Sequence, residues 1–292
     1  MESIHLSLPD WIDDYMYLTD EKIIAKKYSN IIWDLLATEL DNIKEILNTK
    51  GVVKILIEKS EYSEDILKWF LLWICNYLGI PTYTDQVQKK MLWNITPKEN
   101  INRFTTFSEV DGEALLHTDS QFSPQPEHYF LLYCSIPANI WGISYLVEIK
   151  DILEEIKKEI NGNDILKFLN EVKVPFRVPS IFTKTWDDSS IEIYKSTILS
   201  KDNKEIRFRF DTVEEALKIA PNLLTDKEIR LFRYFQEMLE HRVKKVNIKL
   251  KSWECLIIDN KKLLHWRTAF EDPNRLLYRI RFNNNIWKTK LC

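Results

Sequence analysis

The stretch CLIIDNKKLLHWRTAFEDPNRLLYRIRF, residues 255–282, decides the fold of this chain. Its apolar run CLII predicts a buried strand, DNKK predicts a turn, and the alternating segment RLLYRIRF predicts a second strand. Successive side chains of a strand point to opposite faces. One face of the second strand therefore carries Leu276, Tyr278, Ile280 and Phe282, and the other carries Arg275, Leu277, Arg279 and Arg281.

Three guanidinium groups on one strand face repel each other unless anions meet them. An arginine that points inward binds a dicarboxylate through a two-pronged hydrogen bond, which a lysine matches poorly. The alternative is an exposed edge strand whose charges prevent pairing with other chains. The arginine face thus predicts either a site for a small anion or a protected sheet edge.

Helices and short strands account for the rest of the chain. Apolar spacings of three and four predict helices at 20–47, 63–78, 149–170 (broken at 161–163) and 225–242. Strands are predicted at 51–58, 91–95, 103–107, 129–135, 144–147 and 246–250, an extended segment at 172–179, and a hairpin of 191–199 with 205–210. Strands separated by turns, with helices segregated from them, predict an α+β fold built on an antiparallel double sheet.

We expect one domain over residues 1–292, with a helical N-terminal decoration at 1–90 and an insertion of helices and a hairpin at 150–245. The net charge of −3 argues against nucleic acid as a partner and favours a small-molecule substrate. The four cysteines lack metal-site spacing and three lie in apolar runs, which predicts reduced thiols and a cytoplasmic location. Neither a signal peptide nor a membrane-length apolar run is visible, and nothing in the sequence indicates an oligomeric state.

One triplet has the spacing of a metal site. His117 and Asp119 stand two residues apart in an extended segment, so both side chains project to the same side. His265 follows the DNKK turn and is expected at a strand end, from which it could supply a third ligand. Two imidazoles and one carboxylate suit a redox-active divalent iron with open coordination positions. The alternatives are an HxD triplet that occurs by chance and a histidine that caps a loop.

The chain resembles the Fe(II)/2-oxoglutarate-dependent oxygenases of the taurine dioxygenase (TauD/TfdA) and clavaminate synthase-like superfamily. The resemblance is carried by FTTFSEVDGEALLHTDSQF (104–122), WGISYL (141–146) and the stretch 255–282. It implies a jelly-roll core, a double-stranded β-helix, and iron bound by His117, Asp119 and His265. It also implies that Arg275 binds the far carboxylate of the cosubstrate 2-oxoglutarate, that Arg279 lines the same pocket and that Ser144 shares the carboxylate.

Two departures from the family pattern, and one match to it, bear on chemistry. The glycine pair before the hydroxyl residue is reduced to Trp141-Gly142, and the usual HGR reads His265-Trp266-Arg267. We expect the indole of Trp266 to narrow the substrate pocket. Relatives that halogenate replace the iron-binding carboxylate by a small residue, so Asp119 predicts an enzyme that uses O2 to hydroxylate, desaturate or otherwise oxidise its substrate.

The substrate is predicted from the segment FRFDTVEEA (208–216). It resembles the stretch of amino-acid hydroxylases in which an aspartate meets the substrate ammonium, which makes Asp211 a candidate contact; the alternative is a helix N-cap. Arg279 or Arg281 is expected to meet a substrate carboxylate. The sequence therefore predicts hydroxylation of an amino acid or its derivative. A non-catalytic jelly-roll protein that binds a metal, a small molecule or an acidic partner remains the alternative.

Overall fold

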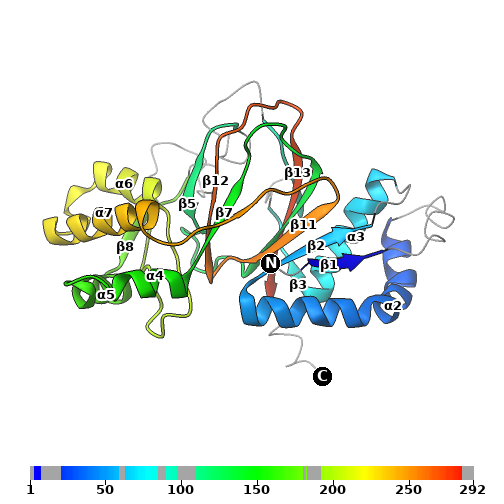
Figure 1. Ribbon diagram of the computed structural model, residues 1–292, viewed down its shortest axis with the longest axis horizontal. Helices are drawn as coiled ribbons and strands as arrows, with labels where there is room; N and C mark the ends of the chain where they lie inside the picture. The colour runs from blue at the N-terminus through cyan, green and yellow to red at the C-terminus, as the bar shows by residue number, and fades with distance from the viewer. Residues whose placement is uncertain are drawn as a thin grey trace.

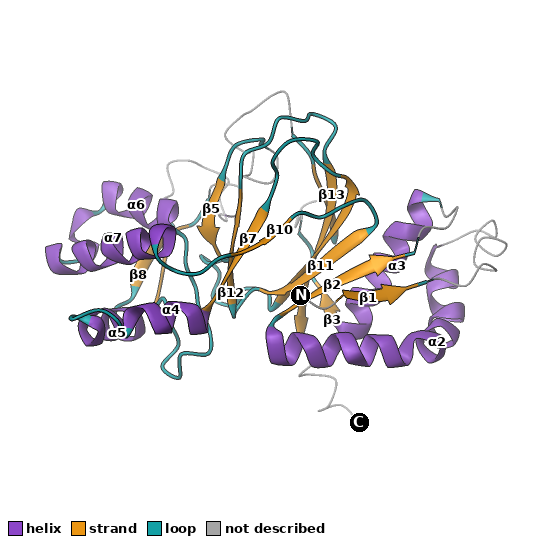
Figure 2. Cartoon of the chain, viewed as in Figure 1, coloured by secondary structure: helices purple, strands orange, loops and turns teal. Residues whose placement is uncertain are grey.

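The computed structural model describes residues 3–7, 21–58, 63–84, 90–97, 110–179, 182 and 192–284, with the side chains of the first helix described from Asp34 onward. Two β-sheets occupy the middle of the molecule, and a group of helices covers each end (Figure 1). The strands and helices are separated in the same way in Figure 2, where the two helical groups flank the strands. The predicted α+β class is confirmed.

The larger sheet has the strand order β1 (Ser3–Leu6), β2 (Val52–Ile57), β11 (Glu254–Asp259), β6 (Tyr129–Ile136), β13 (Leu276–Asn284) and β3 (Gly79–Pro81), and β4 (Leu92–Ile95) also pairs with β13. The smaller sheet has the order β10 (Val246–Ile248), β7 (Ser144–Glu148), β12 (Leu263–Arg267) and β5 (Ala114–His117). A separate pair joins β8 (Val174–Arg177) to β9 (Ile193–Ser196). Every described pairing is antiparallel except the one between β1 and β2. This is the double-sheet jelly roll that the resemblance implied.

The helices are α2 (Glu21–Lys50), α3 (Glu64–Leu78), α4 (Ile149–Ile156), α5 (Gly162–Glu171), α6 (Phe210–Ile219) and α7 (Asp226–His241). α3 begins where the sequence predicted, because the Ser63 hydroxyl accepts a hydrogen bond from the Ile66 amide. α7 begins with the predicted capping box, in which Thr225 and Glu228 satisfy each other's backbone amides. No helix in the described ranges is long and apolar enough to cross a membrane.

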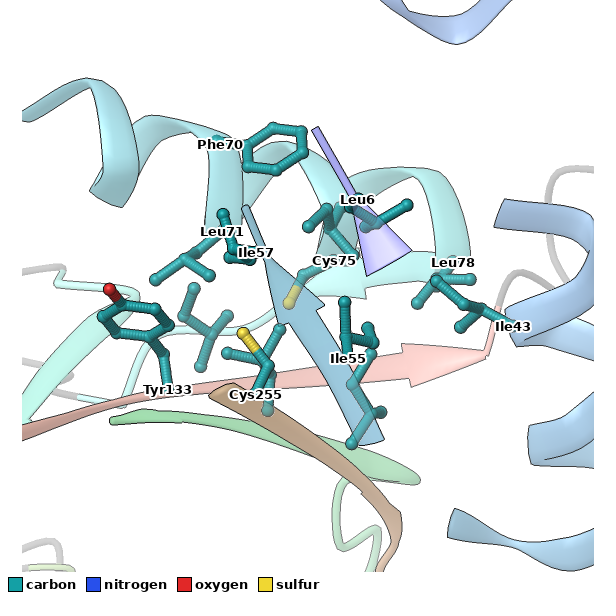
Figure 3. Packing of buried hydrophobic residues seen from close by; sticks show 14 of the residues in the cluster. Leu6, Ile43, Ile55, Ile57, Phe70, Leu71, Cys75, Leu78, Tyr133 and Cys255 are labelled. Carbon is teal, nitrogen blue, oxygen red and sulfur yellow. The ribbon is translucent and has the colours of Figure 1, made fainter. Parts of the chain in front are cut away.

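The two faces of the larger sheet pack against different partners. On the outer face, Cys255, Ile257 and Tyr278 join a core with α2 and α3, as Figure 3 shows for Cys255 and its neighbours. On the inner face, Leu256 and Ile258 pack against residues of the smaller sheet such as Leu146. Burying a side chain of this size stabilises the fold by roughly 1.5–3 kcal/mol. β11 is therefore an anchor strand shared by both cores.

The alternation predicted for β13 is confirmed. Tyr278, Ile280 and Phe282 belong to the outer core, whereas Leu277 belongs to the inner core between the sheets. Arg279 and Arg281 share the face of Leu277 and so point between the two sheets. The protected-edge alternative is wrong, because β13 is flanked by β6 on one side and by β3 and β4 on the other.

Two local predictions are wrong. His265 does not stand at a strand end but lies inside β12, which pairs on both sides. The predicted hairpin keeps its turn, since the Ser200 amide donates to the Glu205 carbonyl oxygen at 2.9 Å. However, β9 pairs with β8, and residues 205–210 form no regular strand: Ile206 bridges Leu199, and Arg209 bridges His117. The strand predicted at 103–107 lies outside the described residues.

Candidate iron and cosubstrate site

The end of β5, the turn that follows it and the middle of β12 bring His117, Asp119 and His265 together. His117 closes β5, Asp119 follows in a turn, and β12 pairs with β5 so that His265 lies directly opposite His117. The Nε2 atoms of both histidines lie 3.7 Å from Oδ1 of Asp119. The three ligand atoms lie within 4.8 Å of one another. The structure thus gathers all three predicted iron ligands at one point.

The donor set suits a divalent metal ion. An ion that bonds nitrogen or oxygen at about 2.1 Å can bind two atoms separated by up to about 4.2 Å, so the 3.7 Å spacings allow one shared ion. His117 contacts the Leu115 carbonyl oxygen through Nδ1 at 2.6 Å, which directs its Nε2 toward Asp119. Burial, then the neighbouring His265 and Arg209, lower the pKa of His117 well below its usual value. His117 is therefore neutral, as a metal ligand must be.

Asp119 stays ionised although it is buried. Burial alone would raise its pKa, but the charges of Arg281 and Arg279 outweigh that effect and hold the pKa well below the usual value. Arg281 contacts Oδ2 through both Nε and Nη2 at 2.9 Å, while Nη1 of Arg279 lies 3.4 Å from the same oxygen. The carboxylate is thus available as an anionic ligand throughout the physiological pH range.

Arg275 and Ser144 line one small cavity between the sheets, together with Gly142. Arg275 is 4 % exposed, and its Nη1 has no hydrogen-bond partner. Arg275 and Arg267 lie over the Phe270 ring at 4.5 and 4.8 Å from its centroid. Burial lowers the pKa of each arginine to about 10, so both stay charged at neutral pH. A buried cation with a free donor beside a hydroxyl suits a carboxylate.

This cavity lies within reach of the three ligands. Ser144 stands opposite Arg267 in the pairing of β7 with β12, and Leu146 stands opposite His265. The two pairs are two residues apart, which is roughly 7 Å along a strand. Both side chains of each pair point to the same face. Ser144, which lines the cavity together with Arg275, thus lies two strand residues from the level of His265.

The backbone conformation just before Ser144 favours a glycine at position 142. Trp141 and Gly142 both adopt left-handed conformations, with φ of 64° and 66°. A Cβ on Gly142 would lie 3.2 Å from the Ala138 Cβ and 3.6 Å from Nε of Arg275. Gly142 therefore lets the chain turn into β7 while it passes close to the arginine.

The expectation for Trp266 is wrong. Trp266 points to the opposite face of β12 from His265 and stacks on Tyr145 of β7, with ring centroids 4.5 Å apart. It packs against the core formed with helices α4 to α7. Because neighbouring strand residues face opposite ways, the indole supports the smaller sheet from behind and does not narrow the pocket.

Asp211 lies in the first turn of α6, and the N-cap of this helix is Arg209. Its carboxylate accepts hydrogen bonds from Nε and Nη2 of Arg209 at 2.8 and 3.0 Å. Arg209 in turn forms an isolated backbone bridge with His117, which places the Arg209–Asp211 pair beside the iron ligands. Sequence reasoning found Asp211 but missed Arg209. The alternation FRFD, which repeats a charge at every second residue, is the signal that could have found it.

The comparisons with known proteins agree with this geometry. The sequence model of the family described as "Taurine catabolism dioxygenase TauD, TfdA family" matches residues 32–281. No curated protein matches the chain in sequence. Among solved structures, an asparagine oxygenase in complex with Fe(II), 2S,3S-3-hydroxyasparagine and succinate is similar with a TM-score of 0.71 at 13% identity, over 96% of this chain and 93% of the other.

A second similar structure is the non-heme iron oxygenase OrfP in complex with Fe and alpha-ketoglutaric acid. It has a TM-score of 0.67 at 12% identity, over 98% of this chain and 96% of the other. At these identities the solved structures establish the shared fold, whereas the family match covers most of the sequence. The chain belongs to the TauD, TfdA family and is an Fe(II)- and 2-oxoglutarate-dependent oxygenase.

Proposed function

We propose that the chain hydroxylates an unactivated C–H bond of an amino acid or a close derivative and releases succinate and CO2. In this proposal His117, Asp119 and His265 bind Fe(II), and Arg275 with Ser144 binds the far carboxylate of 2-oxoglutarate. The observation that carries it is the gathering of two imidazole nitrogens and one carboxylate oxygen within 4.8 Å of one another, together with the buried Arg275, whose Nη1 has no hydrogen-bond partner.

The bound iron, with 2-oxoglutarate and O2, supplies the oxidising power that C–H cleavage needs. The residues of the chain bind the cosubstrate, orient it and shield the site from water. Arg275 binds the far carboxylate of 2-oxoglutarate, so that the 2-oxo acid end of the cosubstrate is directed toward the metal. Phe130, whose ring centroid lies 4.8 Å from that of His265, contributes an apolar wall that keeps water from one side of the metal ligands.

The substrate class is inferred from charge. The Arg209–Asp211 pair beside His117 offers one cation and one anion, which together match the carboxylate and ammonium of an amino acid. The similar structures point to the same class: one contains 3-hydroxyasparagine and another contains (3R,4R)-dihydroxy-L-Arg. We propose that Asp211 contacts the substrate ammonium and that Arg209 or Arg279 contacts its carboxylate.

A panel of free amino acids tests this proposal by substrate-stimulated succinate release, followed by mass spectrometry of the product. We expect a gain of one oxygen atom in at least one amino acid. For that substrate Asp211→Asn should raise KM by roughly tenfold or more, because a charge-assisted hydrogen bond is worth about 1.5–3 kcal/mol. The control is Asp202→Asn, an exposed turn residue. Turnover of the true substrate that is unchanged in Asp211→Asn contradicts the assignment.

We also propose that the protein is a single-domain cytoplasmic enzyme. The support is that Cys75, Cys134 and Cys255 are all free and buried among the described residues, as reduced thiols of an intracellular protein usually are.

A further inference from the structure

We propose that Arg281 and Asn260 form a clamp that holds Asp119 as a one-oxygen ligand of the iron, and that Arg281 is a positioning residue instead of a substrate contact. This inference rests on the proposed iron site. It assigns a function to two buried polar side chains that the family pattern leaves without one.

Arg281 determines which carboxylate oxygen faces the metal. Its guanidinium contacts Oδ2 of Asp119 twice, from Nε and from Nη2, each at 2.9 Å. The other oxygen, Oδ1, is the one that lies 3.7 Å from Nε2 of His117 and of His265. A carboxylate whose second oxygen is held by a two-pronged arginine presents only one oxygen to an ion. Asp119 is therefore set as a monodentate ligand.

The number of ligand oxygens has a direct chemical consequence. A six-coordinate ion bound by two imidazoles and one carboxylate oxygen keeps three positions open. The chelating end of 2-oxoglutarate would take two of these positions and would leave one for O2. If the carboxylate used both oxygens, only two positions would remain, and O2 would compete with the cosubstrate. The Arg281 contact preserves the third open position.

Asn260 fixes the backbone of the same residue. It lies in the turn between β11 and β12, is 2 % exposed, and accepts a hydrogen bond from the Asp119 amide at 2.7 Å. Its Nδ2 donates to the carbonyl oxygens of Asp119 at 3.1 Å and Glu127 at 3.0 Å. Both backbone polar groups of Asp119 are thus held by one side chain, just before Ser120 takes a left-handed φ of 53°.

The clamp also ties the ligands to each other. Asn260 leads into β12, which carries His265, while Arg281 lies on β13 of the larger sheet. Asp119 is therefore positioned from both sheets at once, although its own turn carries no regular pairing. Arg279 holds the same carboxylate less tightly than Arg281, because only its Nη1 lies near Oδ2 of Asp119, at 3.4 Å.

Cobalt(II) serves as a probe of this clamp, because its binding does not require turnover and its visible absorption reports coordination number. Apo protein is titrated with Co(II) by calorimetry, and the absorption spectrum is recorded at saturation for wild type, Arg281→Met and Asn260→Ala. Arg281→Lys keeps the charge with one donor atom. The control is Arg233→Met, which removes a similar two-pronged contact, to Glu214, on the surface of α7.

We expect Arg281→Met to weaken Co(II) binding by about tenfold to a hundredfold and to change the saturated spectrum, because the released oxygen can join the metal. Asn260→Ala should weaken binding by a smaller factor, Arg281→Lys should restore part of the affinity, and Arg233→Met should match wild type. Circular dichroism verifies folding, and if Arg281→Met does not fold, Arg281→Lys and Asn260→Ala decide the question. Wild-type affinity and spectrum in the folded clamp variants would overturn the clamp. Absence of Co(II) binding in wild type would instead overturn the proposed iron site.

Discussion

Replacing Arg275 by leucine should selectively weaken the binding of 2-oxoglutarate. Arg275 is 4 % exposed, its pKa of about 10 keeps it charged at neutral pH, and its Nη1 has no partner in the described structure. A charged hydrogen bond contributes about 1.5–3 kcal/mol, which corresponds to roughly 10- to 150-fold in affinity. The fold should tolerate this substitution. Among the described residues no carboxylate contacts the Arg275 guanidinium, so its removal leaves no buried anion without a partner.

Anaerobic titration of the Fe(II)-loaded protein with 2-oxoglutarate, followed by the visible absorption of the chelate, measures this affinity. The Fe(II) affinity measured without cosubstrate should not change, because the three metal ligands are untouched. Arg275→Lys should fall between wild type and Arg275→Leu, and Arg230→Leu, an exposed residue of α7, should match wild type. A wild-type dissociation constant for 2-oxoglutarate in Arg275→Leu would refute the assignment of the cavity at Ser144 and Arg275.

Further predictions concern the packing of Trp266 and the reactivity of the buried thiols. Trp266→Leu should lower the free energy of unfolding by about 0.5–1.5 kcal/mol through loss of the Tyr145 stack, with KM for substrate unchanged. A changed substrate range would show that the indole reaches the pocket after all. Burial raises the pKa of the Cys75 and Cys255 thiols well above the usual value, so iodoacetamide should label them only in denaturant, as read by peptide mass spectrometry. Rapid labelling of the native protein would count against the core in Figure 3.

The local pattern of apolar and capping residues correctly predicted strand faces and helix starts. The alternation of β13 correctly separated Tyr278 from Leu277, and the caps at Ser63 and Thr225 correctly marked two helix starts. These features depend on neighbours a few residues away, so one sequence contains all the information that they need.

Features that depend on pairing partners were predicted less well. His265 was expected at a strand end after the DNKK turn, yet β5 and β7 pair with the segment LLHWR on both sides and make it a strand. The same pairing turns Trp266 away from the pocket. Whether such a segment is a strand depends on partners more than a hundred residues away, which local patterns do not contain.

The polar residues around the iron ligands show the same limit. The HxD spacing pointed to His117 and Asp119, whereas nothing local marks Asn260 as the side chain that holds the Asp119 backbone. Arg281 was expected to meet a substrate carboxylate because it shares a strand face with Arg275. In the structure Arg281 instead contacts the carboxylate of Asp119. This partner depends on the three-dimensional arrangement, because Asp119 is distant from Arg281 in the sequence.

The most direct test of the account is anaerobic addition of Fe(II) and 2-oxoglutarate to the purified apo protein, with the visible spectrum and bound iron both measured. The account predicts one iron per chain and a charge-transfer absorption that appears only when both components are present, and it predicts that His265→Ala loses both signals. A wild-type protein that shows no such absorption, or a His265→Ala variant that retains it, would contradict the claim that these three side chains share one ferrous ion.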